Sequence, residues 1–585
     1  MKRLGMPVAA FFGVAVLCLI ATTWFLNRDA LQKSVEAQIR AVTGLDLVVK
    51  GSIDISVFPA SYVSFHDVGL KGGMSDEPAL HVDVLTANLR LLPLLLRRFG
   101  NCATVERPAA TPRGRGRKAA LVSRWCAAAA SPGVRRALRR FEISDVMMLR
   151  PTIRVVRDGN GDSNWTPFVE TIARTMKPGA ENQVSFSEIR IQDGVLKYQD
   201  SASHSAETLT DIDLSLAWPS ISRSFAATGQ FDWRGERVDG SVSAGDFVAL
   251  LSGERSGLKA RLTSAPLKLA FDGAVANRTS LMMEGTVTVD SMSLRNALRW
   301  TGQQPPAGGG FGRFALKARA NVVGGSVALT NVNVELDGNV AEGVMTFANN
   351  GRQTVQATLA AGNLDFTPYI STVRLIASGA RDWNRQLFDL NALSATDLDM
   401  RLSAARVTVG ATRLGRTAFG ANLRNGALAL SVGEAQMYGG IARGSLGISR
   451  ADDVADVRAQ FQLTDVDLQA AAGELFGMTK LSGRGNLNVS LVASGSSPFG
   501  LASSLDGTTT LAGHDGASSG FNVEQLLKRL ERRPLSGAGN FRQGSTPYDS
   551  ITVSVKFADG IATAEDIRVE SPTSRLKLTG TASVP

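Results

Sequence analysis

The chain has 585 residues, too many for one ordinary domain, and at about 100–200 residues per domain it implies several modules or one elongated repeating body. Hydrophobic residues make up 44% and charged residues 20%, which excludes a largely disordered chain and a polytopic membrane protein. The 59 glycines and only 6% aromatic residues favour many short strands and tight turns over long helices, and three cysteines exclude a disulfide-stapled scaffold.

The formal net charge of +10 arises in one stretch of the chain. Residues 97–140 contain twelve basic residues and one acidic residue, whereas the rest of the chain has 51 basic and 52 acidic residues. The basic balance therefore belongs to one segment and not to the whole surface. Because a chain-wide polyanion-binding surface has no support, we predict no nucleic-acid partner.

A membrane anchor is expected near the N-terminus. Residues 6–26 carry no charge and are long enough, at about 1.5 Å per residue, to cross a hydrocarbon core of about 30 Å. A cleavable signal peptide is the alternative, but bulky residues at positions 24–26 stand where an A-x-A-like cleavage site would lie. Two basic residues precede the span and favour a cytoplasmic N-terminus. We therefore expect a single-pass inner-membrane protein, with residues 28–585 in the periplasm of a bacterium.

The residues after this span alternate between helical and extended patterns. Residues 31–42 have apolar positions at helical spacing, which predicts an amphipathic helix that ends near Gly44. From Leu45 onward apolar residues alternate on both sides of Gly51, which predicts a β-hairpin closed by Pro59. This order of helix, glycine, strand, glycine, strand and proline resembles the N-terminal module of the AsmA family of inner-membrane-anchored envelope proteins.

Two further motifs resemble the same family. One is a proline followed by an Asn-Trp pair, here Pro151 and then Asn164-Trp165. The other is a strand, the pair Asp193-Gly194 and a second strand. The second motif predicts a hairpin without any family resemblance, because glycine accepts positive φ without a Cβ clash.

The middle of the chain, roughly residues 205–500, repeats short alternating apolar runs between Gly, Asn and Asp. The uneven spacing predicts many strands and not a fixed-period solenoid. Short amphipathic helices are expected at residues 294–300 and 468–476, each after an Asp or Ser suited to capping. Residues 303–310, with the sequence QQPPAGGG, are the clearest linker.

The last hundred residues combine strands with one helix. A strand is expected to lead to Asp515-Gly516, and an amphipathic helix begins near Val523. More strands are expected on both sides of a turn at Asp559-Gly560. This order resembles the C-terminal region of AsmA-like proteins over about 120 residues.

These elements divide the chain into seven parts. We predict a cytoplasmic tip and membrane anchor (1–27), an N-terminal AsmA-like module (28–98), a basic insertion (99–140), a β-rich body (141–300), a Gly/Pro linker (301–310), a β-rich middle (311–460) and a C-terminal AsmA-like region (461–585). The insertion lacks a strand pattern and is expected to be a solvated loop or a reading-frame artefact. Alternatively, it holds anionic lipid headgroups, which clustered Arg and Lys attract by about 1 kcal/mol each.

No catalytic, cofactor or metal site is predicted. The four histidines show no metal-ligand spacing; they are His66, His81, His204 and His514. Residues 516–520 fit the pattern G-x-S-x-G, with Ser518 as the candidate nucleophile. No histidine follows Ser518 in the order that an α/β-hydrolase requires, so a glycine-rich turn is the favoured interpretation. The protein is therefore expected not to be an enzyme.

The expected fold is mostly β. An N-terminal transmembrane helix precedes an elongated, curled antiparallel-type β-sheet groove or sandwich with a few short amphipathic helices. Each alternating strand has one apolar face that a helix, another sheet or a ligand must cover, and the predicted helices are few. The AsmA resemblance implies a groove, because AsmA-like proteins are grouped with bridge-like lipid transfer proteins built from such sheets.

The candidate groove-lining residues belong to the alternating runs, and a closed dry core is an equally open interpretation for each. They are Val332, Val334, Leu428, Leu430, Val553 and Val555. The resemblance implies a non-enzymatic protein that supports outer-membrane biogenesis by binding or transporting phospholipid. Its expected partners are phospholipid and the inner membrane, with no cofactor. The alternatives are a structural or regulatory factor that works with outer-membrane assembly proteins, and a secreted serine hydrolase.

Overall fold

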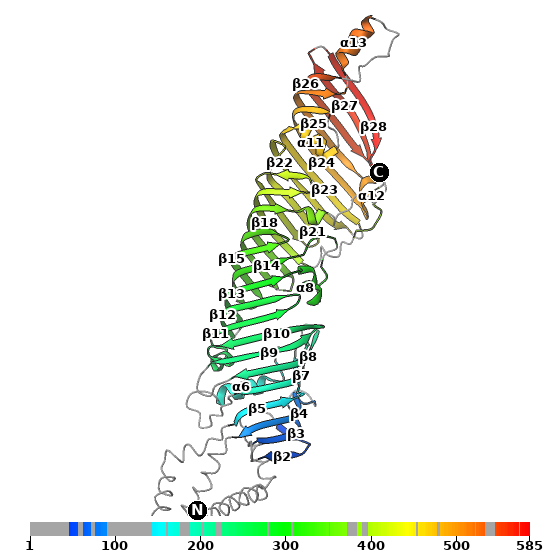
Figure 1. Ribbon diagram of the computed structural model, residues 1–585. Helices are drawn as coiled ribbons and strands as arrows, with labels where there is room; N and C mark the ends of the chain where they lie inside the picture. The colour runs from blue at the N-terminus through cyan, green and yellow to red at the C-terminus, as the bar shows by residue number, and fades with distance from the viewer. Residues whose placement is uncertain are drawn as a thin grey trace, which may run out of the picture. The chain divides into compact units, whose positions relative to one another are not determined.

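A computed structural model gives the fold over most of the chain (Figure 1). It describes residues 46–56, 62–71, 77–89, 143–159, 162–175, 188–201, 204–217, 224–277, 280–305, 308–349, 351–370, 383–388, 396–451, 454–476, 480–520, 522–532, 544–572 and 574–585. The predicted membrane span, the predicted helix at 31–42 and the basic insertion lie outside these residues. Within the described ranges, no helix combines the length and the hydropathy needed to cross a membrane.

The protein is mostly β, as the sequence predicts, and it divides into two compact units. The N-terminal unit ends at Gly285 and the C-terminal unit begins at Thr286. The strands of the N-terminal unit are β1 (Asp46–Val49), β2 (Ile53–Ser56), β3 (Tyr62–Lys71), β4 (Leu80–Leu89), β5 (Ile143–Leu149), β6 (Thr152–Arg157), β7 (Glu188–Asp200), β8 (Ser205–Ala217), β9 (Phe225–Trp233), β10 (Glu236–Ala244), β11 (Ser256–Ser264) and β12 (Lys268–Asn277), and β13 (Leu281–Ser291) crosses the boundary. Its helices are α6 (Thr166–Thr175) and α7 (Phe247–Leu251).

The C-terminal unit contains longer strands. They are β14 (Phe314–Val323), β15 (Ser326–Leu336), β16 (Asn339–Asn349), β17 (Gln353–Asp365), β18 (Thr396–Val409), β19 (Thr412–Leu414), β20 (Thr417–Arg424), β21 (Ala427–Met437), β22 (Gly440–Ala451), β23 (Val454–Asp467), β24 (Leu481–Gly495), β25 (Asp506–Ser519), β26 (Ser545–Ala558), β27 (Ile561–Ser571) and β28 (Ser574–Ser583). Its helices are α8 (Leu294–Trp300), α9 (Thr367–Ile370), α11 (Leu468–Phe476), α12 (Pro498–Ser503) and α13 (Val523–Arg532). The helices predicted at 294–300 and 468–476 are confirmed.

Strand pairing is mainly between chain neighbours and mainly antiparallel. In the C-terminal unit β14 to β17 pair in order, and β18 continues through β20 to β28 in order. The exceptions to an antiparallel sheet are β17 with β18, and β5 and β6 with β7, which are parallel. The sheet is therefore mixed, and only its dominant pairing matches the antiparallel type expected from sequence.

The predicted hairpin around Gly51 is wrong. Strands β1 and β2 do not pair with each other, because both pair antiparallel with β3. The backbone N–H of Gly51 donates to the carbonyl of His66 at 3.1 Å, so the two strands form one interrupted strand. A Cβ at position 51 would lie 2.5 Å from that carbonyl oxygen. The glycine allows a close backbone approach and not a reversal of the chain.

The Asp-Gly pairs divide into turns and bulges. Asp559-Gly560 forms the predicted turn between β26 and β27, with φ of 46° and 71°. Asp193, in contrast, lies inside β7 at a shift of register, with φ of 51°, so the hairpin predicted there is wrong. Asp515-Gly516 likewise lies inside β25 and does not end it. Left-handed backbone suits a type I′ turn and a β-bulge equally, and the local residues do not distinguish them.

The Asn-Trp motif fastens helix α6 to strand β6. The Asn164 side chain is buried, donates to the Arg154 carbonyl at 2.9 Å and accepts from the Val156 N–H at 3.0 Å. The Trp165 indole donates to the same Arg154 carbonyl at 2.7 Å. These hydrogen bonds give the motif a structural role in the N-terminal unit.

Asp337 forms hydrogen bonds with the segment that directly follows the predicted linker. The Asp337 carboxylate accepts from the N–H groups of Phe311 and Gly312, at 2.9 and 2.7 Å, and from the Tyr369 hydroxyl at 2.5 Å. Burial, together with Asp337, raises the pKa of the Tyr369 phenol. The carboxylate thus ties the loop before β14 to the β15–β16 turn and to α9.

Asp337→Ala is expected to destabilise this corner by about 2 kcal/mol, because two N–H groups and a phenol lose their acceptor. Local opening of residues 308–314, measured by hydrogen exchange in the full chain, reports the change. Asp559→Ala is the matched control, since Asp559 has the same left-handed turn position without these hydrogen bonds. Equal effects of the two substitutions would contradict this account.

Candidate functional site

The main candidate site is one face of the C-terminal sheet, on which apolar side chains form rows across successive strands. Directly paired residues in a β-ladder point to the same face. One row runs Ala320, Leu329, Met345, Ala357, Met400, Ala421, Leu430, Leu446, Ala459, Leu491, Gly507, Phe557, Ala562 and Ala582. We call the face that carries this row and its neighbours the apolar face.

Two further rows lie beside the first on the same face. The second runs Val332, Gly343, Leu359, Leu402, Phe419, Val432, Gly444, Phe461, Val489, Thr509, Val555, Ala564 and Gly580. The third runs Leu316, Val334, Ala341, Ala361, Ala404, Thr417, Ala435, Ala442, Leu463, Leu487, Leu511, Val553, Ile567 and Leu578. None of these positions carries a charged side chain.

The opposite face of the same strands is polar. In β23 the residues that alternate with the apolar rows are Arg458, Gln460 and Gln462, and in β24 they include Asn488 and Ser490. Such alternation is typical of a sheet with one face in water and one face in an apolar environment. The C-terminal unit therefore presents two chemically distinct surfaces.

The apolar face is covered at its edges and accessible in its middle. Along β23 the exposed fraction is 2% at Ala455, 42% at Phe461 and 0% at Val466. Helix α11 packs against the Val466 end, where Leu468 and Ala471 join the core cluster around Val466. Helix α12 lies at the opposite end of β24, because a Cβ on Gly495 would lie 2.5 Å from the Gly500 carbonyl carbon.

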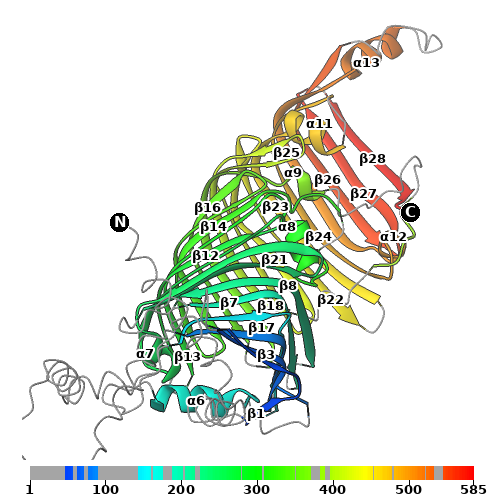
Figure 2. The same ribbon diagram turned by 60° about the horizontal axis from the view of Figure 1, so that its bottom comes forward.

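The sheet that carries the apolar face is curved. Figure 2 shows strands of the C-terminal unit bending along their length, with α11 and α12 at opposite ends of the strands between them. The two helices cover opposite ends of β24 and leave the apolar face accessible between them, at Phe461 of the neighbouring strand. Such a surface can take an apolar molecule in the place of a second protein layer.

The six residues predicted to line a groove all lie on the apolar face, in different surroundings. Val332 is buried at 1% exposure, within a cluster that includes Ala318 and Leu329, and Val334 packs against this cluster. Leu430 is 38% exposed. The remaining three are intermediate in exposure: Leu428, Val553 and Val555. Val332 thus belongs to a local core, and Leu430 to the accessible middle.

Sequence reasoning missed several residues of the accessible middle, such as Phe461 and Val489. The signal was present, because in β23 the stretch from Val457 to Leu463 alternates strictly between apolar and polar residues. The neighbouring stretch of β24, with Leu487, Val489 and Leu491, alternates in the same way.

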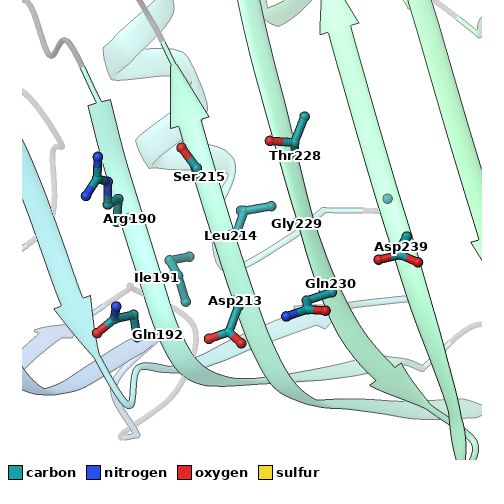
Figure 3. Close-up of a pocket in the computed structure, with 11 residues that line it drawn as sticks. Arg190, Ile191, Gln192, Asp213, Leu214, Ser215, Thr228, Gly229, Gln230 and Asp239 are labelled. Carbon is teal, nitrogen blue, oxygen red and sulfur yellow. The ribbon is translucent and has the colours of Figure 1, made fainter.

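A hollow also lies on the N-terminal unit, and its arginine is already engaged with a carboxylate. Its cavity volume is about 640 Å³, and Figure 3 shows side chains of β7, β8, β9 and β10 around it. Arg190, the basic residue of the lining, forms two hydrogen bonds of 2.8 Å with Glu188. Hydrogen bonds from Arg190, and then from Ser215, hold the pKa of Glu188 below its ordinary value. With its arginine engaged in this way, the hollow is a weak anion site.

The G-x-S-x-G segment has no nucleophile-elbow geometry. Ser518 lies within β25, paired with Leu481 on one side and Thr546 on the other, and not at a turn from strand to helix. Gly516 makes room for Tyr548, whose hydroxyl crosses β25 and donates to the Ser482 carbonyl of β24. Burial raises the pKa of this phenol. The first glycine of the segment therefore serves strand packing.

Three histidines of the described residues lie near carboxylates: His66 and His514 near one each, and His81 near both Asp67 and Asp83. His66 lies 3.1 Å from Asp54, and His514 lies 2.9 Å from Asp515. In the described part of the chain, no group of three His, Cys, Asp or Glu residues is arranged to hold a metal ion.

Substitutions of Gly516 and Ser518 test whether residues 516–520 serve strand packing or catalysis. Gly516→Val is expected to destabilise β24 to β26 by more than about 2 kcal/mol, because the new Cβ meets the Ser482 carbonyl and the Tyr548 hydroxyl. Ser518→Ala is expected to change stability by less than about 0.5 kcal/mol. Hydrogen exchange of β25 measures the first effect. A hydrolytic activity of the purified chain that Ser518→Ala removes, while the fold stays stable, would contradict the packing interpretation.

Comparison with known proteins identifies the region that carries much of the apolar face. The AsmA family model matches residues 375–567, about a third of the chain. Residues 375–567 are therefore similar to the AsmA family. The match includes β18 to β26 and most of β27, so the AsmA region contributes most strands of the apolar face. No curated protein and no solved structure matches the chain.

The AsmA match and the earlier sequence resemblance overlap only in part. The match covers much of the C-terminal region in which the strand and helix order resembles AsmA-like proteins. The N-terminal resemblance, around Gly51 and the Asn164-Trp165 pair, lies outside residues 375–567 and stays a prediction. The match therefore concerns the C-terminal part of the chain alone.

Proposed function

We propose that this protein binds phospholipid through its acyl chains on the apolar face and, by moving it along the sheet, supports outer-membrane biogenesis. In this proposal the protein is a non-enzymatic, single-pass inner-membrane protein whose bulk lies in the periplasm. Its partners are phospholipid and the inner membrane. The observation that carries the proposal is an uncharged face that is accessible at Leu430 and Phe461, while helices α11 and α12 cover the two ends of the neighbouring strand β24.

The energetics favour such a surface as an acyl-chain carrier. An acyl chain of about sixteen methylenes faces a cost of about 13 kcal/mol on entering water, at about 0.8 kcal/mol for each methylene. Rows of Leu, Val, Phe and Ala replace the water contacts with apolar contacts, so the chain avoids most of that cost. Binding of this kind needs neither a cofactor nor a catalytic residue.

Site-specific photo-crosslinking in cells tests the proposal. A photoreactive amino acid at Leu430, on the apolar face, is expected to give adducts with phospholipid. The matched control is Gln460, which lies on the polar face of β23 and is expected to give none. Protein adducts alone at Leu430 would favour the alternative, a scaffold for outer-membrane protein assembly.

A further inference from the structure

Strand β28 forms an open edge of the C-terminal sheet (Figure 2). In the part of the chain that the structure describes, β28 pairs with β27 alone. Every residue of β28 after Ser574 is exposed, including Leu576 at 41% and Leu578 at 46%. An unpaired edge of this kind presents a row of backbone N–H and C=O groups with which another strand can pair.

β28 has few of the features that usually protect an edge strand from pairing. Its ten residues include no proline, and the extra residue at the irregularity in its ladder lies on β27. Its two cations, Arg575 and Lys577, lie 3.7 and 4.0 Å from carboxylate oxygens of β27, which offset the positive charge of the edge. By contrast, the edge formed by β1 and β2 in the N-terminal unit consists of two strands of four residues each.

The outward-facing backbone groups of β28 belong to its odd-numbered residues. The Val584 N–H, directly after the strand, donates to the Gly560 carbonyl at 2.9 Å, toward β27. Successive residues of a strand direct their N–H and C=O groups to alternate sides. Residues 575, 577, 579, 581 and 583 therefore direct these groups away from β27, where a partner strand can reach them.

These groups match a second copy of the same strand in one antiparallel register. When Thr579 lies opposite the partner's Thr579, all the outward groups of both strands are paired, in about ten hydrogen bonds. On the apolar face Leu578 then lies opposite the partner's Gly580, where a Cβ would meet no atom within 4 Å, so the space is open. Leu576 lies opposite the partner's Ala582, so a large side chain again meets a small one. Registers centred on residues 575, 576 or 577 place cations opposite cations, which is unfavourable.

We infer that this protein forms a twofold homodimer in which β28 of one copy pairs antiparallel with β28 of the other, centred on Thr579. In this register both cations of the strand lie opposite hydroxyl side chains, Ser583 and Thr581 of the partner subunit. The pairing closes both open edges, which limits assembly at this site to two copies. The inference concerns the sheet edge and does not depend on what the apolar face binds.

A proline at position 579 tests the interface in the purified full-length chain. Thr579→Pro removes an outward N–H group and places a ring at the edge, while the hydrogen bonds to β27 remain. We expect the dissociation constant of the dimer, measured by analytical ultracentrifugation in mild detergent, to rise at least about tenfold. Thr579→Ala keeps the N–H group and is the matched control, expected to change the constant by less than about threefold.

Hydrogen exchange of residues 561–571 is expected to be the same in both variants, because neither substitution alters the ladder between β27 and β28. An unsubstituted chain that is monomeric, or a dimer that Thr579→Pro leaves intact, would overturn the inference.

Disulfide trapping tests the register independently of the proline variant. The full chain is used with its three native cysteines replaced by serine. Thr579→Cys is expected to form a disulfide-linked dimer on mild oxidation, because position 579 lies opposite the same position of the partner subunit. Lys577→Cys is the matched control, since its counterpart in the partner lies four residues along the strand, about 14 Å away and too far for a disulfide. Equal linkage of the two chains, or linkage of neither, would overturn the inference.

Discussion

Replacement of Leu430, Phe461 and Val555 together by glutamate is expected to lower phospholipid capture at least about tenfold. The three residues lie on β21, β23 and β26, on two adjacent rows of the apolar face. An acyl chain seated there would contact carboxylates, and each 1.4 kcal/mol of lost contact energy reduces binding about tenfold. Lipid that copurifies with the full chain, quantified by mass spectrometry, measures the effect.

The matched control moves the same charges to the other face. Ser431, Gln460 and Ser554 neighbour the three residues in sequence and alternate with them on the strands. Glutamate at these positions is expected to leave lipid capture unchanged. Because all six positions are partly or largely exposed, both variants are expected to keep the strand content of the unsubstituted chain in circular dichroism. Equal lipid loss in the two variants would contradict a role for one particular face.

Val332→Asp is expected to have the largest effect on stability. Val332 is 1% exposed and packs in a cluster with Ala318, Ala320 and Leu329. An unpaired carboxylate in this cluster is expected to destabilise β14 to β16 by more than about 3 kcal/mol. Hydrogen exchange of residues 326–349 in the full chain reports the loss of protection. The comparison is Leu430→Asp, whose partly exposed side chain is expected to cost less than half as much. Similar costs at both positions would contradict a division into local core and accessible middle.

The alternation of apolar and polar residues was enough to predict strands and one-sided apolar faces, and helical spacing after a capping residue predicted the short helices at 294–300 and 468–476. It placed Val332, Leu430 and Val555 on a common surface, because period-two patterning fixes the side of a strand to which a residue points. The alternation did not predict which residues of that surface are buried. Whether Val332 or Leu430 is buried depends on contacts between distant segments, such as that of Val287 with the Val332 cluster.

Backbone reversals were the least predictable feature. Asp193-Gly194 and Asp559-Gly560 contain the same dipeptide and begin with similar φ, 51° and 46°. Only the second joins two paired strands, while the first is a bulge inside β7. The difference depends on whether the next residues pair with the preceding strand or continue past it, which involves strands far apart in sequence. The same reason explains why Gly51 was assigned to a hairpin.

The most direct test of the account is to count phospholipid on the purified full-length chain by native mass spectrometry, after extraction in mild detergent. If the apolar face holds acyl chains, we expect bound phospholipid on the unsubstituted chain and little on the variant with glutamates at positions 430, 461 and 555. A chain that carries no phospholipid, or that carries equal amounts with and without these glutamates, would contradict the account.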